Sequence, residues 1–218
     1  MLKRTFDICF SLFGIFISLP LWLLLSLLIL IKEGRPVFFL QERAGKGGLV
    51  FKSFKFRSMI RDAEKDVGPV QAKENDARIT GVGSFLRKSA MDELPQLMNI
   101  YKGEMSFVGP RALRPFEIEL HACGDPEKDI ESLLHSERSK IVPGLTGVAQ
   151  VFAPRDVPRA EKFKYDVWYV KNRKFVLDLE LIFLSFIITF LGKWEVRKEK
   201  ICGLGIYSWL QTKITREI

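Results

Sequence analysis

The feature that most constrains this chain is an uncharged apolar stretch near its start. Residues 8–31 read ICFSLFGIFISLPLWLLLSLLILI, about 24 residues without a charged side chain. About 20 apolar residues in a helix are enough to cross the hydrocarbon core of a bilayer. The stretch is too long for the apolar region of a signal peptide, and no small-residue cleavage site follows it. The sequence therefore predicts a membrane helix.

The path of this helix through the membrane has two interpretations. Pro20 lies near its middle, where a proline removes a backbone hydrogen bond and clashes with the preceding turn. Both flanks are basic, with Lys3 and Arg4 before the stretch and Lys32 and Arg35 after it. The positive-inside rule then gives no clear orientation. The residues alone leave open a helix that spans the membrane and a re-entrant helix that bends at Pro20 and returns.

A second apolar stretch begins at Phe175 and reads FVLDLELIFLSFIITFLG. Asp178 and Glu180 interrupt it, and the remaining uncharged part, about 12 residues, is too short to span a bilayer. We expect an interfacial or core helix here. The basic run 193–200 follows, and the tail beyond it carries Tyr207 and Trp209. Such a tail suits contact with a membrane surface and equally suits a protein partner.

The composition points to an anionic partner. The 218 residues carry a formal net charge of +8, which favours nucleic acid, phosphates or an anionic membrane surface. No helix-turn-helix, zinc-finger or RNP-like motif occurs, so we expect no nucleic acid partner. The three cysteines form no C-x-x-C pair, and only two histidines occur. A disulfide framework, a thiolate zinc site and a Ser-His-Asp triad are therefore disfavoured.

The middle of the chain predicts a mixed α/β domain that is irregular and rich in loops. Residues 36–59 read as two strands joined by a glycine turn at Gly45–Gly48. Ser84 is expected to cap a short helix, and Gly103 to end the next one. Residues 105–109 read as a short strand, and residues 142–152 as a glycine- and proline-rich loop that leads into a strand. One apolar helix face is expected from Leu94, Leu97, Met98 and Tyr101.

Two adjacent acids, Asp92 and Glu93, open the motif MDELPQL. In one interpretation Asp92 is a helix N-cap and Glu93 a first-turn residue favoured by the helix dipole. In the other, the two carboxylates hold Mg²⁺ and one of them attacks a phosphorus atom. The spacing alone leaves both interpretations open.

Several basic side chains surround this motif in the sequence. Each of them on its own is most simply a solvated surface group. Arg111, however, directly follows Gly109-Pro110, a rigid turn that fixes its direction. Guanidinium groups bind phosphate oxygens in a bidentate fork, and two acids with several fixed arginines suit a diphosphate with Mg²⁺. The candidates are Lys55, Arg57, Arg78, Arg87, Arg111 and Arg114.

The ordered set of motifs resembles the bacterial sugar transferase family, also called monotopic phosphoglycosyl transferases. The motifs are PVFFLQERAGKGGLVFKSFKFRSM, FLRKSAMDELPQLMNIYKGEMSFVGPR, VPGLTGVAQV and YDVWYVKN followed by LDLEL. The resemblance extends from about Lys3 to Leu191. It implies transfer of a sugar-1-phosphate from a UDP-sugar to a polyprenyl phosphate, with release of UMP, as the first membrane step of a glycoconjugate or polysaccharide.

The resemblance also implies roles for particular residues. Asp92 is the expected nucleophile, which forms a covalent phosphosugar intermediate, and Glu93 assists it and is associated with Mg²⁺. The implied substrate phosphate site consists of Lys55, Arg57, Arg87 and Arg111, with Gln150 and Asp166 as further candidates. Two other functions stay open: a nucleotide-diphosphosugar hydrolase, in which water replaces the lipid phosphate, and an inactive membrane scaffold for polysaccharide assembly.

The resemblance favours a re-entrant membrane helix with its bend at Ser18 and Pro20. The expected organisation is a re-entrant helix over residues 1–33, a catalytic domain with interfacial helices over 34–192, and a basic, aromatic tail over 193–218. The expected location is the bacterial inner membrane, with the catalytic domain on the cytoplasmic side. The expected partners are the UDP-sugar, the polyprenyl phosphate and the lipid bilayer, and a homodimer is left open.

Overall fold

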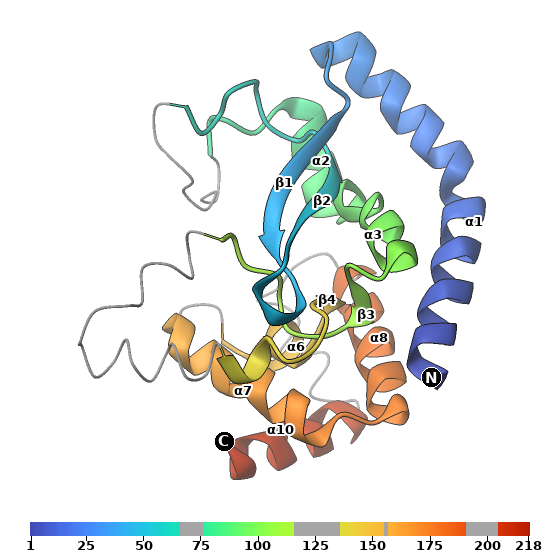
Figure 1. Cartoon of the computed structure of the whole chain (residues 1–218). Helices are drawn as coiled ribbons and strands as arrows, with labels where there is room; N and C mark the ends of the chain where they lie inside the picture. The colour runs from blue at the N-terminus through green and yellow to red at the C-terminus, as the bar shows by residue number, and fades with distance from the viewer. Residues whose placement is uncertain (66–75, 116–135, 155–156, 191–204) are drawn as a thin grey trace.

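A computed structural model of the chain describes residues 1–65, 76–115, 136–154, 157–190 and 205–218. In this part of the chain, helices surround two small sheets, each of two strands. The long helix α1 arches along one side, a β-hairpin lies near the centre, and the helices α6, α7, α8 and α10 gather at one end (Figure 1). The predicted mixed α/β class is confirmed.

Helix α1 spans Leu2–Glu33 and is continuous, with Pro20 inside it. Among the described residues it is the one helix long and apolar enough to cross a membrane, and only 11% of its apolar window is buried. That low burial excludes the core helix of a soluble domain as the reason for its composition. Its large exposed side chains include Phe10, Phe13, Phe16, Leu23, Leu24, Leu27 and Ile31.

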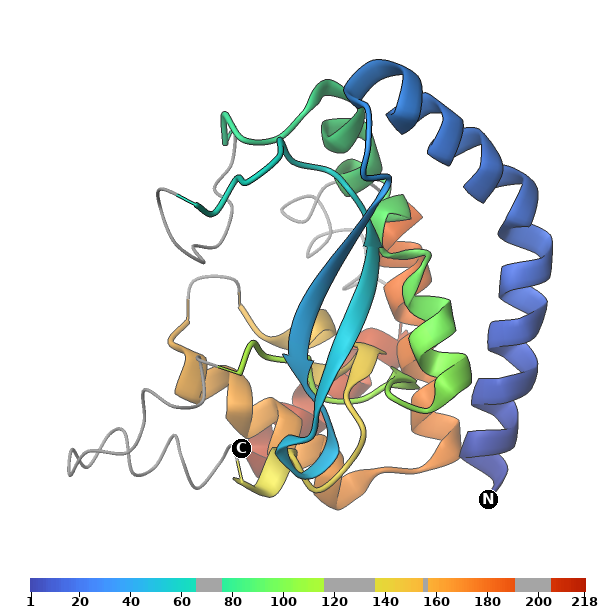
Figure 2. The ribbon, with the colours of Figure 1, turned by 45° about the horizontal axis from the view of Figure 1, so that its top comes forward.

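Helix α1 curves but does not break at Pro20. Two views show it running past α3 and then arching toward the top of the hairpin (Figure 2). Pro20 has no N–H, so the carbonyl of Phe16 lacks its intrahelical donor. The hydroxyl of Ser18 donates to the carbonyl of Gly14 at 2.6 Å, and back-bonding of this kind bends helices. The helix nevertheless stays continuous at the predicted bend, where it curves instead of breaking.

Both ends of α1 are attached to the rest of the protein. At the N-terminal end, Lys3 Nζ donates to Asp178 Oδ2 at 2.7 Å and to the Tyr169 hydroxyl at 3.0 Å. At the C-terminal end, Arg57 Nη2 donates to the carbonyls of Glu33 and Gly34 at 2.8 and 2.7 Å. The two termini of the apolar helix thus contact a single folded unit.

Further bonds strengthen the N-terminal attachment. The guanidinium of Arg4 donates to the carbonyls of Ile100 and Tyr101, both at 2.6 Å. Asp7 is buried, and its Oδ1 accepts from the hydroxyl of Ser106 at 3.1 Å and from the backbone N–H of Phe107 at 3.2 Å. The first two turns of α1 therefore bind the same segment that leads to Arg111.

The predicted hairpin is confirmed. Strands β1 (Phe38–Ala44) and β2 (Val50–Phe56) pair antiparallel, and a 3₁₀ turn, η1 (Lys46–Gly48), connects them. Gly47 and Gly48 have φ angles of 65° and 81°, which glycine adopts without a steric penalty. The register pairs Arg43 with Phe51 and Phe39 with Lys55.

Two helices follow the hairpin. Helix α2 (Gly81–Lys88) is capped by Thr80, whose Oγ1 accepts from the N–H of Gly83 at 2.9 Å. The predicted cap at Ser84 is wrong, because Ser84 lies inside the helix. Helix α3 (Gln96–Lys102) ends at Gly103, as predicted, with φ 87°.

The predicted apolar face of α3 is only partly correct. Leu97 is buried and Leu94 and Met98 are half-buried, but Tyr101 is 43% exposed. Ile100 is fully buried in its place. Because α3 begins only at Gln96, the positions that face the core are displaced from the predicted series.

The second sheet pairs β3 (Ser106–Val108) in parallel with β4 (Gly144–Thr146). The strand at β3 was predicted. The prediction of a loop and then a strand over residues 142–152 is wrong, because the strand comes first and the short helix α6 (Val148–Phe152) follows. Val148, Val151 and Phe152 are all buried, and their spacing of three and four residues suits a helix.

The main core lies between α6, α7 (Arg159–Asn172), α8 (Phe175–Phe190) and α10 (Gly205–Glu217). Helix α8, from the second apolar stretch, has two apolar faces. One face buries Leu177, Leu181, Leu184 and Ile188, and the other exposes Val176, Leu179, Phe183 and Phe186. One face of α8 lies in the core, which confirms the core part of the expectation of an interfacial or core helix.

The described part of the C-terminal tail is helix α10. Tyr207 is buried and stacks on Phe152 with ring centroids 4.9 Å apart, whereas Trp209 is 58% exposed. Trp168 Nε1 donates to Glu217 at 2.7 Å. The basic run 193–200, its Trp194 and the expected boundary at residue 192 lie outside the described residues.

Candidate active site

The two adjacent acids lie in a short 3₁₀ turn, η2 (Met91–Glu93), between α2 and α3. Ala90 precedes it in a left-handed conformation, with φ 54°. Asp92 does not cap a helix: the residue before α3 is Pro95, and no side chain bonds there. The N-cap interpretation of Asp92 is wrong, because α3 begins four residues further along the chain.

Lys55 is the cation in direct contact with this pair. Its Nζ lies 2.5 Å from Glu93 Oε1, and the two side chains are 19% and 30% exposed. Lys55 comes from β2, so the hairpin holds an ammonium group against η2. This ion pair links the hairpin to the acidic motif.

The two carboxylates have opposite protonation behaviour. Burial and the neighbouring charge of Glu93 raise the pKa of Asp92 to about 6, against the opposing effect of Lys55 and Arg87. Burial also raises the pKa of Glu93, but Lys55, Arg111 and Arg43 outweigh it and lower that pKa to about 2. One acid titrates near neutral pH and the other stays ionised. Such a division within a pair is typical of acids with different catalytic roles.

Arg111 is presented to this pair by a close packing of backbones. The N–H of Gly109 donates to the carbonyl of Thr146, and the N–H of Gly144 donates to the carbonyl of Pro110, both at 2.9 Å. A Cβ atom on Gly109 or Gly144 would lie within 3 Å of neighbouring backbone atoms. The turn that carries Arg111 therefore depends on two glycines.

A buried ion pair holds the backbone of Arg111. Arg138 donates to Asp166 Oδ2 at 2.8 Å, and its Nη2 donates to the carbonyl of Arg111 at 2.5 Å. The side chains of Arg138 and Asp166 are only 4% and 3% exposed. Asp166, expected at the substrate phosphates, is thus connected to Arg111 through Arg138.

Gln150 has unused hydrogen-bonding groups next to this turn. Within the described residues, its buried amide nitrogen and oxygen have no hydrogen-bond partner, and neither does the hydroxyl of Thr146. The Oε1 of Gln150 would lie 2.9 Å from a Cβ atom on Gly147, and Gly147 itself packs against Gly109. Gln150 is therefore near the segment that carries Arg111, with its amide free for a ligand.

The structure assembles some of the predicted site residues and separates others. Lys55, Arg87 and Arg111 act electrostatically on Asp92 or Glu93. Arg57 instead binds the carbonyls at the end of α1. Arg78 pairs with Asp76 at 2.6 Å, and Arg114 with Glu64 at 2.7 Å.

Arg43 and Arg138 are the two site residues that the sequence analysis missed. Arg43 helps to lower the pKa of Glu93, and its Nη1 donates to the carbonyl of Ala112 at 3.0 Å. Arg138 stabilises the backbone of Arg111. Arg43 belongs to the hairpin motif, but only the observed strand register shows that it lies on the same face as Lys55.

The acidic pair suits a metal ion that the protein and the substrate coordinate together, rather than a metal site formed by protein side chains alone. In the described ranges no cluster of three or more His, Cys, Asp or Glu residues is present. Mg²⁺ commonly uses one or two carboxylates together with substrate phosphate oxygens. Asp92 and Glu93 supply the two carboxylates, so the donor set fits this mode.

Paired acids among cations, on a domain with an exposed apolar N-terminal helix, are typical of a membrane-associated protein that handles phosphorylated substrates. The chain belongs to the bacterial sugar transferase family, whose model matches residues 1–192.

Curated relatives agree with this family. The chain is 35% identical over 196 residues to an undecaprenyl-phosphate galactose phosphotransferase of Salmonella typhimurium, covering 84% of this chain and 39% of that protein. It is 37% identical to a UDP-N-acetylgalactosamine-undecaprenyl-phosphate N-acetylgalactosaminephosphotransferase of Aeromonas hydrophila, covering 84% and 42%. It is 39% identical to the exopolysaccharide production protein PSS of Rhizobium leguminosarum bv. phaseoli, covering 84% and 92%. The chain thus spans about two-fifths of the first two relatives.

Proposed function

We propose that this protein transfers a sugar-1-phosphate from a UDP-sugar to a polyprenyl phosphate through a covalent intermediate on Asp92. The observation that carries the proposal is the acidic pair Asp92 and Glu93, held by Lys55 at 2.5 Å and influenced by three arginines. The names of two relatives, which contain undecaprenyl phosphate and either galactose or UDP-N-acetylgalactosamine, support the substrate classes.

In the first step a carboxylate oxygen of Asp92 attacks the β-phosphorus of the UDP-sugar. The bond from this phosphorus to the bridging oxygen breaks, and UMP leaves with the electron pair. With a pKa of about 6, Asp92 is mostly ionised at neutral pH and yet more basic than an ordinary aspartate. Both properties favour a nucleophile.

In the second step a phosphate oxygen of the polyprenyl phosphate attacks the same phosphorus. The bond to Asp92 breaks, the carboxylate is restored, and the product is a polyprenyl diphosphosugar. Covalent catalysis thereby separates the donor, which arrives from water, from the acceptor, which arrives from the membrane. Both steps use one site near the membrane.

The surrounding cations suit the charge that develops in both steps. Lys55 is held by Glu93, Arg87 lies in the last turn of α2, and Arg111 is fixed by its glycine turn. Arginine forks and ammonium groups stabilise phosphoryl oxygens in the transition state. A Mg²⁺ ion held by Asp92 and Glu93 would neutralise further charge on the diphosphate.

We also propose that α1 is re-entrant, so that the protein enters one leaflet of the inner membrane from the cytoplasmic side. The attachment of both helix ends to one folded unit supports this path. A straight spanning helix would place Lys3 across the bilayer from Asp178. The exposed apolar side chains of α1 and of α8 would then face lipid.

The test is an assay of UMP release from a panel of UDP-sugars, with and without polyprenyl phosphate. UDP-galactose and UDP-N-acetylgalactosamine are the first donors to try. We expect sustained UMP release only with the lipid, and at most one UMP per protein without it. Sustained release without the lipid would instead identify a hydrolase.

Asp92→Asn is the matched control for this assay, since it retains the shape and removes the nucleophile. We expect the variant to lose UMP release under both conditions. No release by the unmodified protein with any donor would favour the scaffold, and near-normal release by Asp92→Asn would refute the covalent role of Asp92.

A further inference from the structure

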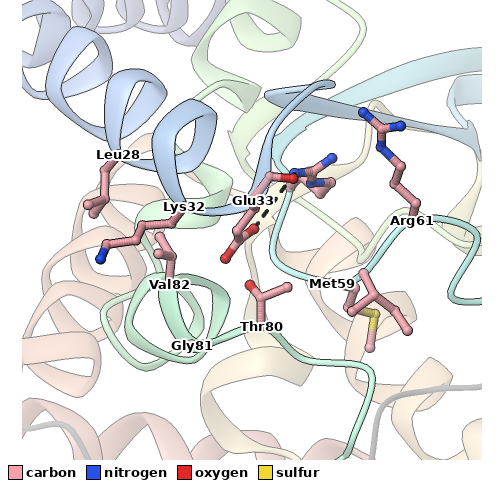
Figure 3. Close-up of a pocket in the computed structure, with 10 residues that line it drawn as sticks. Leu28, Lys32, Glu33, Met59, Arg61, Thr80, Gly81 and Val82 are labelled. Atoms are coloured by element: carbon pink, nitrogen blue, oxygen red, sulfur yellow. Dashed lines mark hydrogen bonds and ion pairs between the residues drawn. The ribbon is translucent and has the colours of Figure 1, made fainter.

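A cavity of about 650 Å³ lies at the point where α1 ends. Its walls come from the last turns of α1, the segment after β2 and the start of α2 (Figure 3). Glu33 points from the end of α1 toward Thr80 at the start of α2. The volume lies within the range of small-molecule sites in proteins.

Two buried charged side chains face this cavity with unused hydrogen-bonding atoms. The side chains of Arg57 and Glu33 are 6% and 9% exposed. Arg57 uses Nη2 on the carbonyls of α1, but its Nε and Nη1 have no hydrogen-bond partner among the described residues. The same holds for both carboxylate oxygens of Glu33. The closest approach of the pair, from Nη2 to Oε2, is 3.9 Å, too long for a hydrogen bond.

Buried charged groups with unsatisfied hydrogen-bonding atoms are costly, so this arrangement suits a ligand that pairs with those atoms. The ligand must offer acceptors to Arg57 and donors to Glu33. A diphosphate group alone is a poor match, because it offers acceptors to Arg57 but no donor to the carboxylate of Glu33. A neutral group that carries both carbonyls and N–H or O–H donors fits both side chains.

The remaining walls favour a flat, partly apolar group. Leu28, Met59 and Val82 line the cavity beside the charged pair, and the cations Lys32 and Arg61 line it as well. A pyrimidine base has apolar faces, and its edge carries carbonyl acceptors and an N–H donor. The attached ribose adds a pair of hydroxyl donors. We infer that this cavity binds the nucleoside part of the sugar donor, with Arg57 and Glu33 as its polar contacts.

The position of the cavity relative to Asp92 is consistent with one extended donor molecule. Thr80, Gly81 and Val82 line the cavity at the start of α2, and η2 follows shortly after the end of this helix. The eight residues of α2 span about 12 Å at 1.5 Å per residue. The diphosphate would lie between the nucleoside and Asp92. The inference therefore rests on the proposed UDP-sugar donor and deepens it.

Gly81 offers a way to fill the cavity without disturbing the backbone. A Cβ atom on Gly81 would meet nothing within 4 Å, and the residue is not in a left-handed conformation. Gly81→Leu therefore places a side chain at the cavity wall. Gly205→Leu is the matched control, because Gly205 also begins a helix, α10, with nothing within 4 Å of a Cβ.

Glu33→Gln is a second variant that does not rely on filling space. It retains the side-chain shape and the backbone carbonyl that Arg57 binds, but replaces a charged acceptor with a neutral amide. Hydrogen bonds to charged groups are the stronger ones. We therefore expect weaker nucleoside binding with α1 still attached.

The experiment is a calorimetric titration of the purified full chain with UMP, together with the KM for polyprenyl phosphate. We expect UMP to bind at least about tenfold more weakly to Gly81→Leu and to Glu33→Gln. Gly205→Leu should bind UMP as the unmodified protein does, and the KM for polyprenyl phosphate should stay unchanged in all variants.

The outcomes separate this inference from the proposed function. Equal UMP affinity in both cavity variants, in a protein that still transfers sugar phosphate, overturns the cavity assignment alone. A raised KM for polyprenyl phosphate with unchanged UMP affinity also overturns it, and assigns the cavity to the lipid acceptor. Failure of the unmodified protein to bind UMP overturns the inference together with the UDP-sugar donor.

Discussion

Asp92 and Glu93 are neighbours in the chain, yet their surroundings give them different tasks. Burial and the charge of Glu93 keep the proton of Asp92 bound up to about pH 6. Glu93, in contact with Lys55, remains ionised down to about pH 2. The difference comes from the cations around Glu93, which is in direct contact with Lys55 and is also influenced by Arg111 and Arg43. A sequence shows the two acids but not this asymmetry.

The first prediction is a rise of activity with pH through about 6. Protonated Asp92 is not a nucleophile, so kcat/KM should increase as the carboxyl ionises and reach a plateau near pH 7. Lys55→Met removes a cation that lowers this pKa, and should move the midpoint to higher pH. The measurement is kcat/KM for the UDP-sugar between pH 5 and 8. A profile that falls over this range, or a midpoint that moves down in Lys55→Met, would contradict the assignment.

The second prediction concerns Asp166 as a positioning residue. Asp166→Asn leaves Arg138 buried without its counter-charge, which typically costs about 3–5 kcal/mol of unfolding free energy. The carbonyl of Arg111 then loses a firm partner, so the KM for the donor should rise more than kcat falls. Unfolding in detergent and steady-state kinetics measure the two effects.

Glu161→Gln is the control for Asp166→Asn, because Glu161 lies on the same helix in an exposed pair with Lys164 at 2.6 Å. Such surface pairs contribute about 0–1 kcal/mol. Comparable destabilisation by both substitutions would show that the Arg138 pair has no special role.

At the scale of elements, the hairpin shows how far the sequence could predict the site. Its two strands and its glycine turn were predictable from the alternation of residue types and from Gly45–Gly48. The register was not, because a shift of one residue moves every side chain of one strand to the opposite face. Only the observed pairing, Arg43 with Phe51 and Phe39 with Lys55, places Arg43 and Lys55 on one face. Arg43 was missed for this reason.

The helices around the acidic pair show the same limit. The spacing of apolar residues predicted α3, and Gly103 predicted its end. The sequence did not show that a 3₁₀ turn would separate Asp92 from α3, since the carboxylates equally suit a helix start. Arg138 follows a long polar segment and forms its bonds across more than 25 residues, so no local pattern identifies it.

The third prediction uses the two faces of the hairpin. Arg43→Met removes a charge on the face of Lys55 and should lower kcat/KM about tenfold, equivalent to about 1.4 kcal/mol of transition-state stabilisation. Lys52→Met removes the same charge from the opposite face, where Lys52 is exposed and pairs across the strands with Glu42. It should leave kcat/KM nearly unchanged. Equal losses in both variants would point to a general effect of charge rather than to a place in the site.

At the scale of the whole molecule, α1 and the rest of the protein form one connected structure. Buried and partly buried polar bonds hold the first turns of α1 against β3 and α8, and Arg57 holds its last turn. Between these attachments, α1 exposes a row of large apolar side chains. A membrane can cover that row while both ends of the helix stay with the domain. In the proposed re-entrant arrangement, the active site would lie close to the surface of the bilayer.

The last prediction tests this arrangement in intact cells. A cysteine replacing Leu2, which is 64% exposed, should react only with reagents that reach the cytoplasm, in a protein whose own cysteines have been replaced by serine. Pro20→Leu alone should change little, because Lys3 and Asp7 still hold the N-terminus to the domain. Adding Lys3→Met, Arg4→Met and Asp7→Leu removes all the side-chain attachments of that end described above, together with two positive charges that favour the cytoplasmic side. The helix should then straighten in part of the population. In those molecules a membrane-impermeant reagent added outside the cells should label the cysteine at position 2. Outside labelling of the protein that retains Lys3, Asp7 and Pro20 would refute the re-entrant path and favour a spanning helix.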